Sequence, residues 1–256
     1  MSAGEVLARA RRWSVSVYRL VWPELDILVG GLIVIVGLWV FVELAGEVSV
    51  GATRSFDERL LLSLRTPGDH HDPLGPRWVE EMIRDFSALG GVAVLTLLTV
   101  WVLGYLVLLH KRRAALLVFV SVVGGWALST LLKAGFERPR PDLVPHGSIV
   151  HTASFPSGHS MMSTVFYLTL GALLARLQPK RRLKVYVLSL AALITLLVGM
   201  SRVYLGVHWP TDVLAGWTVG AVWALCCWLV ALLLQRRGKV EQAGTTPDAP
   251  PEEQRP

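Results

Sequence analysis

Residues 111–141 read KRRAALLVFVSVVGGWALSTLLKAGFERPRP, an apolar run between two groups of charged residues. From 114 to 135 the run carries one charged side chain, Lys133, and it is long enough to cross the hydrocarbon core of a bilayer, which takes roughly 20 helical residues. Backbone polar groups find no water in that core, so such a segment must satisfy them within itself as a helix. The stretch therefore predicts a transmembrane helix with basic residues at both ends.

Further runs of this character dominate the rest of the chain. They lie at 26–46, 88–110, 158–178, 185–203 and 211–234. Over the 256 residues, 53% are hydrophobic and 17% are charged, with a mean hydropathy of +0.51, whereas a soluble domain usually has about 25% charged residues. The sequence predicts an all-α fold, a polytopic membrane helical bundle of six transmembrane helices. In the last of them, Gly216 and Gly220 are spaced for close helix packing.

Basic residues cluster in alternate connectors between these spans. The clusters lie at 111–113, 180–184 and 236–239, with further arginines ahead of residue 26. With six spans, all of them fall on one side of the membrane, and basic connectors of this kind stay in the cytoplasm. Both termini are therefore expected to be cytoplasmic. Because the net charge of +6 follows from these clusters, it indicates membrane topology rather than nucleic acid as a partner.

The segments outside the main apolar region have their own character. No small-residue cleavage site follows the first apolar run, so we expect it to be retained as a span behind a cytoplasmic segment, residues 1–25. Residues 236–256 are rich in Pro, Glu and Gln, which is typical of a disordered tail. Residues 26–235 then form the membrane domain. Within it, residues 47–86 are more polar and contain several prolines, which predicts short amphipathic helices in the first extracytoplasmic segment.

Three polar blocks adjoin the apolar spans, at 133–141, 156–159 and 201–212. Each has an ordinary explanation when taken alone: Lys133 can extend to the membrane interface, Arg202 can complement a helix dipole, and single histidines are common at interfaces. The predicted topology, however, brings all three blocks to the extracytoplasmic face. Their chemistry must therefore be considered together.

The blocks contain the groups that bind a phosphate. Three permanent cations can neutralise the equatorial oxygens of a phosphoryl group, and the arginines can do so in a bidentate manner. A glycine where the chain enters a helix lets an anion approach free backbone N–H groups, and a serine beside it can donate a hydroxyl hydrogen bond. The expected phosphate-binding residues are Lys133, Arg140, Ser157, Gly158 and Arg202. Since no carboxylates cluster in the sequence, these cations are expected to act without a metal ion, and no cofactor is predicted.

Two histidines and an aspartate supply the groups for catalysis. His208 and Asp212 are four residues apart, so on one helical turn the carboxylate can accept the Nδ1 proton and leave Nε2 as a nucleophile. A histidine nucleophile forms a covalent phospho-intermediate. His159 would protonate the leaving oxygen and then activate water. The candidate catalytic residues are therefore His208, His159 and Asp212.

The spacing of these residues resembles the type 2 phosphatidic acid phosphatase (PAP2) superfamily, whose pattern is K-x6-RP, PSGH and SR-x5-H-x3-D. The matching residues are Lys133 with Arg140-Pro141, Pro156-Ser157-Gly158-His159, and Ser201-Arg202 with His208 and Asp212. The resemblance covers roughly the second half of the chain and implies the same residue roles. It also implies hydrolysis of a membrane lipid phosphate or diphosphate, of the phosphatidic acid, phosphatidylglycerol phosphate or undecaprenyl diphosphate type. The expected location is the extracytoplasmic face of a bacterial inner membrane.

Other interpretations remain open at this stage. A lipid phosphotransferase would use the same intermediate with a lipid acceptor in place of water. A non-catalytic binder or transporter of lipid phosphates would need the cations but not the paired His208 and Asp212. Arg138 lies outside the family pattern, and it either assists a second phosphate of a diphosphate substrate or faces lipid headgroups.

Overall fold

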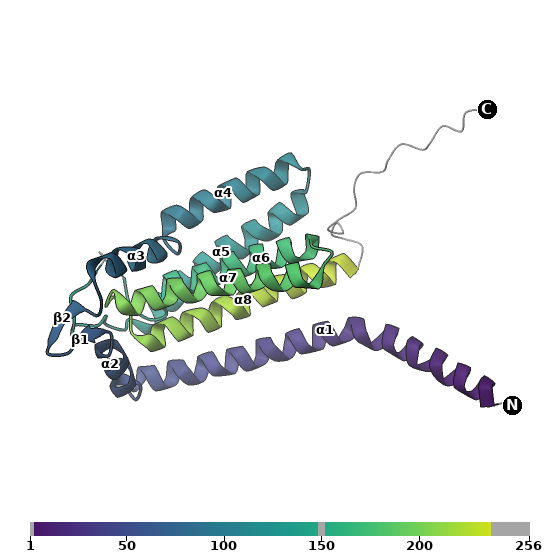
Figure 1. Cartoon of the computed structure of the whole chain (residues 1–256), viewed down its shortest axis with the longest axis horizontal. Helices are drawn as coiled ribbons and strands as arrows, with labels where there is room; N and C mark the ends of the chain where they lie inside the picture. The colour runs from purple at the N-terminus through teal and green to yellow at the C-terminus, as the bar shows by residue number, and fades with distance from the viewer. Residues whose placement is uncertain (1–2, 148–151, 237–256) are drawn as a thin grey trace.

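The computed structural model describes residues 3–147 and 152–236, and its helices run back and forth along one common direction (Figure 1). Strands form only one short hairpin among these residues. The elements in chain order are α1 (Ala3–Ser49), α2 (Arg54–Leu62), β1 (Arg65–Thr66), β2 (Asp69–Pro73), α3 (Arg77–Ala88), α4 (Val92–Leu108), α5 (Arg112–Phe136), α6 (Gly158–Leu177), α7 (Arg181–Tyr204) and α8 (Pro210–Arg236).

Long apolar helices make up the bundle. Five helices of the described residues are long and apolar enough to cross a membrane, and there is a sixth if the bent pair α3 and α4 is counted as one span. Large apolar side chains are exposed along their outer faces, for example Leu28, Trp101 and Leu131. Such surfaces are unfavourable in water and suited to lipid. The predicted all-α membrane bundle is confirmed.

The second span departs from the predicted range 88–110. Helix α4 begins at Val92 and has 17 residues, about 25 Å at 1.5 Å per residue, against roughly 30 Å of hydrocarbon. The backbone bends by 46° between α3 and α4, at Gly90–Gly91. The hydroxyl of Tyr167 on α6 donates to the carbonyl of Leu89 over 2.8 Å and ties this bend to the centre of the bundle.

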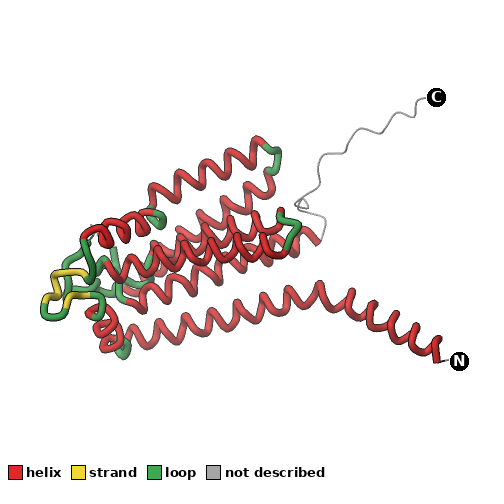
Figure 2. Tube along the Cα trace, in the orientation of Figure 1, coloured by secondary structure: helices red, strands yellow, loops and turns green. Residues whose placement is uncertain are grey.

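The polar segment 47–86 gathers at one end of the bundle as α2, the hairpin and α3 (Figure 2). The short helices were predicted, and the hairpin was not. Its two strands pair Thr66 with Asp69, and the longer strand reads DHHDP, which lacks the alternating apolar pattern of a strand. The hairpin therefore follows from its turn at Gly68, where φ is +89°, a conformation that glycine adopts readily.

The described helices α1 and α8 have their outer ends, Ala3 and Arg236, at the opposite end of the bundle (Figure 1). Helix α1 is already helical from Ala3, so most of the predicted N-terminal segment, residues 1–25, continues the helix of the first span. The tail predicted to be disordered, 236–256, lies outside the described residues except for Arg236.

Helix α6 occupies the centre and packs against α5, α7 and α8. A Cβ atom at Gly216 would lie 2.6 Å from the carbonyl oxygen of Ser157, and one at Gly220 would lie 2.6 Å from that of Met161. The close packing predicted for these glycines is confirmed. It holds the start of α6 directly against the start of α8, where two of the polar blocks meet.

We expect Gly220→Ala to destabilise the bundle by about 1–3 kcal/mol, because the added methyl group must displace α6 backbone. The measurement is the apparent melting temperature in detergent. Gly104→Ala on α4 is the control, since nothing lies within 4 Å of a Cβ there. Equal melting temperatures for the two variants would contradict the close packing.

Candidate active site

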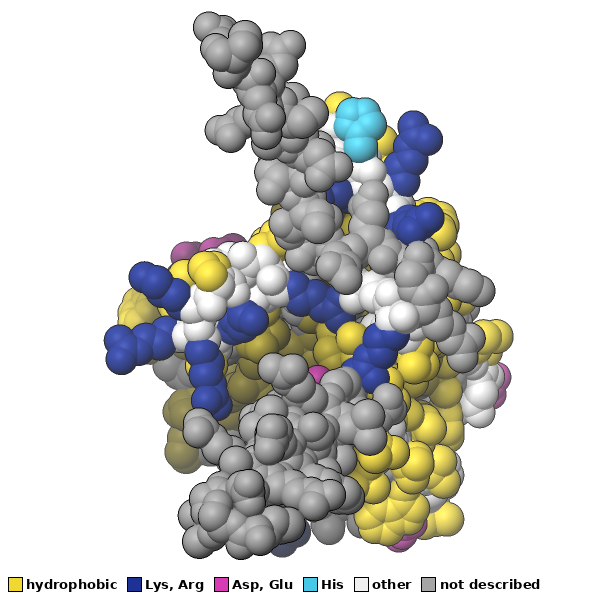
Figure 3. All heavy atoms as spheres, turned by 90° about the vertical axis from the view of Figure 1, so that its right-hand side faces the viewer, with side chains coloured by type: hydrophobic (Ala, Val, Ile, Leu, Met, Phe, Trp, Pro, Cys, Tyr) yellow, Lys and Arg dark blue, Asp and Glu magenta, His cyan; other side chains and the backbone are white. Residues whose placement is uncertain are grey.

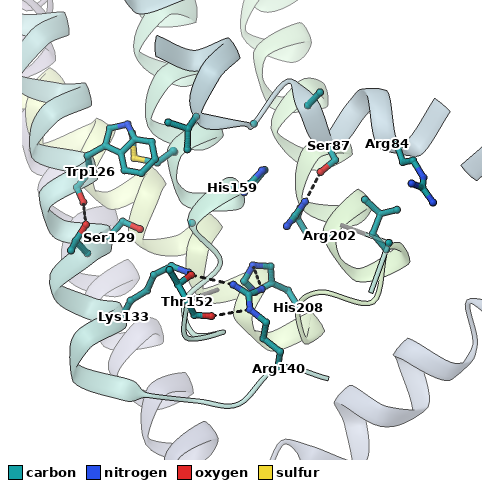
Figure 4. A pocket seen from close by; sticks show the side chains of 18 residues that line it. Arg84, Ser87, Trp126, Ser129, Lys133, Arg140, Thr152, His159, Arg202 and His208 are labelled. Atoms are coloured by element: carbon teal, nitrogen blue, oxygen red, sulfur yellow. Dashed lines mark hydrogen bonds between the residues drawn. The ribbon is translucent and has the colours of Figure 1, made fainter. Parts of the chain in front are cut away.

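A cavity of about 690 Å³ lies at the end of the bundle that carries α2 and α3 (Figure 4). Six of the eight residues predicted for the site line this cavity. They are Lys133, Arg140, Gly158, His159, Arg202 and His208. The other two, Ser157 and Asp212, are fully buried behind its wall. The structure thus brings the three blocks together.

Each block stands at the end of a helix, for local reasons. Helix α5 ends before Glu137, whose φ of +40° is left-handed, and prolines in the next residues prevent it from continuing. Helix α7 ends before Gly206, which has a φ of +70°. Helix α8 begins with Pro210, a favoured first residue of a helix. The helix ends therefore place the three polar blocks beside one another at one end of the bundle.

The cations Lys133 and Arg140 are held by backbone carbonyls rather than by carboxylates. Lys133 donates from Nζ to the carbonyl of Ala153 at 2.9 Å and to the Thr152 hydroxyl at 3.1 Å. Arg140 donates from Nη1 to the carbonyl of Val207 at 2.6 Å and from Nε to that of Thr152 at 2.8 Å. Neutral acceptors orient the two side chains without neutralising them. Their positive charge is left for an anionic ligand.

Arg202 is the third cation and the most enclosed. Its Nη1 donates to the hydroxyl of Ser87 on α3 over 2.7 Å, and its buried Nε has no hydrogen-bond partner among the described residues. Arg84, one turn before Ser87, also lines the cavity. Sequence reasoning missed these two α3 residues, because the polar segment 47–86 carries no motif that relates it to the site.

His208 is buried, with its two ring nitrogens in different surroundings. Nε2 lies 3.2 Å from Nη1 of Arg140, and a guanidinium can only donate, so Nε2 is the nitrogen without a proton. Nδ1 lies 3.4 Å from Oδ2 of Asp212, the acceptor that sequence reasoning predicted, at a distance long for a hydrogen bond. Burial lowers the pKa of His208 from 6.5 to about 4, while the hydrogen bond and charge of Asp212 oppose this shift. The imidazole is therefore neutral at physiological pH.

Asp212 lies behind His208 and accepts several other hydrogen bonds. Its Oδ2 accepts from the backbone N–H of Trp209 at 2.9 Å and from the hydroxyl of Ser154. The Ser154 hydroxyl also lies 3.4 Å from Nδ1 of His208. Sequence reasoning missed Ser154, because it lies in an ordinary polar loop two residues before Pro156. It is the additional residue that supports the histidine and aspartate pair.

His159 stands in the first turn of α6 with its ring directed toward the cavity (Figure 4). The ring makes no hydrogen bond to any residue that the structure describes. It faces the same cavity as His208, the cations and the apolar side chain of Met162. An acid or base at this position is free to meet a ligand.

The remaining predicted residues, Ser157 and Gly158, form the start of α6. The Ser157 hydroxyl accepts from the Ser160 hydroxyl at 2.9 Å and from its backbone N–H at 3.4 Å, so it caps the helix and does not line the cavity. Its own N–H donates to the carbonyl of Asp212 over 2.9 Å. A Cβ at Gly158 would lie 3.4 Å from Cε of Lys133, and its absence leaves the backbone open to the cavity.

Arg138 takes neither of the two places considered from the sequence. Its guanidinium bridges Asp212 and Asp57, with Nη1 2.5 Å from Oδ1 of Asp212 and Nη2 2.7 Å from Oδ2 of Asp57. The side chain is 11% exposed and does not line the cavity. Both terminal nitrogens of Arg138 are thus engaged by buried carboxylates, which need a cation between them. The side chain therefore neither faces lipid headgroups nor reaches a second phosphate.

Taken together, the cavity offers an unprotonated imidazole nitrogen, a second histidine and three cations in one enclosed space. Among the residues described, no group of three His, Cys, Asp or Glu side chains is arranged to hold a metal ion. The cations can stabilise the charge that a metal stabilises in other phosphoryl-transfer sites.

Comparisons with known proteins agree with this arrangement. The PAP2 superfamily model matches residues 114–236. Phosphatidylglycerophosphatase B of Bacillus subtilis is 34% identical over 188 residues, which cover 70% of this chain and 85% of that protein. A lipid A 1-phosphatase of Rhizobium johnstonii is 34% identical over 153 residues, 53% of this chain and 57% of that protein.

A solved structure shares the fold over most of the chain. It is the crystal structure of a transmembrane PAP2 type phosphatidylglycerolphosphate phosphatase from Bacillus subtilis, with a TM-score of 0.68 and 29% sequence identity. The match covers 82% of this chain and 98% of that one. The chain belongs to the PAP2 superfamily and is a membrane phosphatase of the PAP2 type.

Proposed function

We propose that this protein hydrolyses a phosphate or diphosphate group of a membrane lipid through a phosphohistidine intermediate on His208, without a metal ion. One observation carries the proposal. The unprotonated Nε2 of His208 opens toward a cavity whose walls also carry Lys133, Arg140 and Arg202. A nucleophile among three cations has no evident role in a binder or transporter, which needs the cations alone.

In the first step the Nε2 lone pair attacks phosphorus, and the bond from phosphorus to the lipid oxygen breaks. With the anionic phosphate bound among the cations, His159 carries a proton and gives it to that oxygen, so the lipid leaves as a neutral alcohol, or as a monophosphate from a diphosphate. The three cations hold the equatorial oxygens as charge shifts toward the leaving group. Asp212 stabilises the positive charge that the His208 ring acquires, as the aspartate of a serine protease triad does.

In the second step water attacks the phosphohistidine. His159, now neutral, accepts a proton from the water, and the bond from phosphorus to Nε2 breaks. Inorganic phosphate leaves, His208 is neutral again and His159 is protonated for the next cycle. The cations keep the phosphoryl group in place between the two steps.

The shape of the cavity supports a lipid substrate. Its apolar lining includes Trp126 and Met162, and two of its lining residues, Val92 on α4 and Thr130 on α5, are exposed. We infer that the cavity reaches the side of the bundle between these two helices. A phosphate head could enter there while its chains stay in the bilayer.

The charge distribution supports an extracytoplasmic site. Figure 3 views the end opposite to the cavity, where many Lys and Arg side chains gather. Exposed basic residues of the connectors at that end are Arg112, Arg113, Lys180, Arg181, Arg182 and Lys184. By the positive-inside rule that end is cytoplasmic, and the cavity then opens on the other face.

The relatives suggest which lipid to test first. One relative, of which this chain covers 85%, is a phosphatidylglycerophosphatase, and a solved structure with the same fold is a phosphatidylglycerolphosphate phosphatase. We propose phosphatidylglycerol phosphate as the first substrate to assay, with phosphatidic acid and undecaprenyl diphosphate beside it.

We expect His208→Ala to lower phosphate release from phosphatidylglycerol phosphate by about 10⁴-fold or more, because the nucleophile is lost. His71→Ala is the control, since His71 is exposed in the hairpin. In the wild type, acid-labile radioactive phosphate should be trapped on His208 after a rapid quench. Full activity of His208→Ala would disprove the mechanism, and transfer of label to an added lipid rather than to water would identify a phosphotransferase.

We expect activity to survive exhaustive EDTA treatment, because side chains rather than a metal ion carry the positive charge. The measurement is the rate of phosphate release before and after chelation, with and without added Mg²⁺. A rate that falls with EDTA and recovers with Mg²⁺ would contradict a site that uses cations alone.

The buried imidazole also predicts how stability depends on pH. The pKa of His208 is lower in the folded protein, about 4, than its ordinary 6.5, so protonation favours the unfolded chain. Its contribution to stability is complete above pH 6.5 and is lost as the pH falls from 6.5 toward 4. The apparent melting temperature of the wild type should therefore fall more steeply between pH 7 and 4.5 than that of His208→Asn. Parallel curves would contradict a neutral His208.

A further inference from the structure

Arg138 connects the catalytic pair to a part of the chain outside the family pattern. Its two terminal nitrogens divide between two carboxylates, Nη1 toward Asp212 and Nη2 toward Asp57 of α2. The Arg138 guanidinium also lies over the ring of Trp209, 5.6 Å from its centroid, and the hydroxyl of Thr211 accepts a hydrogen bond from Nη1 at 2.9 Å. A planar guanidinium suits this bridge, because its donors have fixed directions.

Asp57 is as fully buried as Asp212, both at 0% exposure. It accepts from the backbone N–H and the hydroxyl of Thr211, at 2.9 and 2.7 Å, and from the hydroxyl of Thr53 at 3.1 Å. Thr211 lies in the first turn of α8, directly before Asp212. The Asp57 carboxylate is therefore bonded both to the start of α8 and to Arg138.

The bonds to Asp212 show why this connection matters for the histidine. Its Oδ1 is bound by Arg138, whereas its Oδ2 serves Ser154, the backbone of Trp209 and His208. A carboxylate can rotate about its last bond, and only a defined rotation leaves one oxygen toward Nδ1. Arg138 holds Oδ1, and Asp57 holds Arg138.

We propose that Arg138 and Asp57 are positioning residues, which hold the Asp212 carboxylate in the orientation that His208 needs for attack on the phosphate. This inference rests on the proposed function and deepens it. Neither side chain lines the cavity, so neither touches the substrate. The segment between α1 and α4 thereby takes part in catalysis through a series of side-chain contacts that runs from Asp57 to Arg138, Asp212 and His208.

This series of contacts from Asp57 to His208 predicts that kcat and KM respond differently to a change at Asp57. Lys133, Arg140 and Arg202 bind the phosphate and do not contact Asp57, so substrate affinity should not depend on Asp57. The rate of attack should depend on it, because a misaligned Asp212 leaves the His208 ring unsupported. Loss of Asp57 should therefore lower kcat and leave KM nearly unchanged.

The test compares Asp57→Asn in two backgrounds, the wild type and Asp212→Asn. The probe is phosphatidylglycerol phosphate with a radioactive terminal phosphate, which allows rates reduced by several orders of magnitude to be followed. The matched control is Asp72→Asn, the same substitution at an exposed aspartate of the hairpin that bonds Thr66. Full-length protein in detergent is used, and melting temperatures are recorded for every variant.

In the wild-type background we expect Asp57→Asn to lower kcat by about 10- to 100-fold, as loss of a partner behind a catalytic ligand does elsewhere. In the Asp212→Asn background the same change should lower kcat by less than about threefold, since the residue through which it acts is already lost. Asp72→Asn should leave kcat unchanged. Equal losses in the two backgrounds, no loss in either, or a loss confined to KM would overturn the proposal.

Arg138→Lys provides a second measure if Asp57→Asn does not fold. Lysine keeps the charge but cannot bind both carboxylates in fixed directions. We expect a fall in kcat with KM unchanged, again much smaller in the Asp212→Asn background. If wild-type protein releases no phosphate from any lipid, the proposed function fails. If it does and Arg138→Lys keeps the wild-type kcat, the positioning role alone fails.

Discussion

The arrangement of the loops at the cavity end of the bundle depends on the buried carboxylate of Asp212. A carboxylate without contact with water costs several kcal/mol unless donors surround it, and removing one partner of such a group is strongly destabilising. Its partners come from three separate places in the sequence. They are Arg138 after α5, Ser154 before α6, and Trp209 and His208 before α8. Because all four partners must reach the same two oxygen atoms, the loops that carry these residues have little conformational freedom. These constrained loops in turn fix the shape of the neighbouring cavity.

The membrane explains why this assembly lies at the end of the bundle. Within the hydrocarbon, helices must satisfy their own backbone and expose apolar side chains, so polar chemistry is confined to helix ends and enclosed spaces. The loops beside the helix ends also carry carbonyl groups outside any helix, and those of Ala153 and Val207 orient the cations Lys133 and Arg140. Neutral acceptors orient a cation without cancelling it. The site therefore keeps a positive charge for its substrate.

Sequence patterns predicted most of the bundle and six of the cavity residues because the signals are local. Apolar runs mark the spans, and Gly216 and Gly220 mark the contact between α6 and α8. The second span was predicted too long, because hydropathy continues smoothly across Gly90–Gly91 while the backbone bends there. Ser157 shows another limit. Its place at a helix start was evident, but only the structure shows that its hydroxyl bonds Ser160 rather than facing the cavity.

The sequence by itself determined the family of the protein and the candidate site residues, because two histidines, an aspartate and three cations are recognisable by residue type and spacing. It also determined that these groups meet at one membrane face, since helices of membrane-spanning length alternate direction. Only the tertiary structure decided which residues support them. Asp57 and Arg138 are 81 residues apart and carry no pattern that relates them, yet they meet at 2.7 Å. Burial of a charge depends on what surrounds it in space, and that is a property of the folded chain.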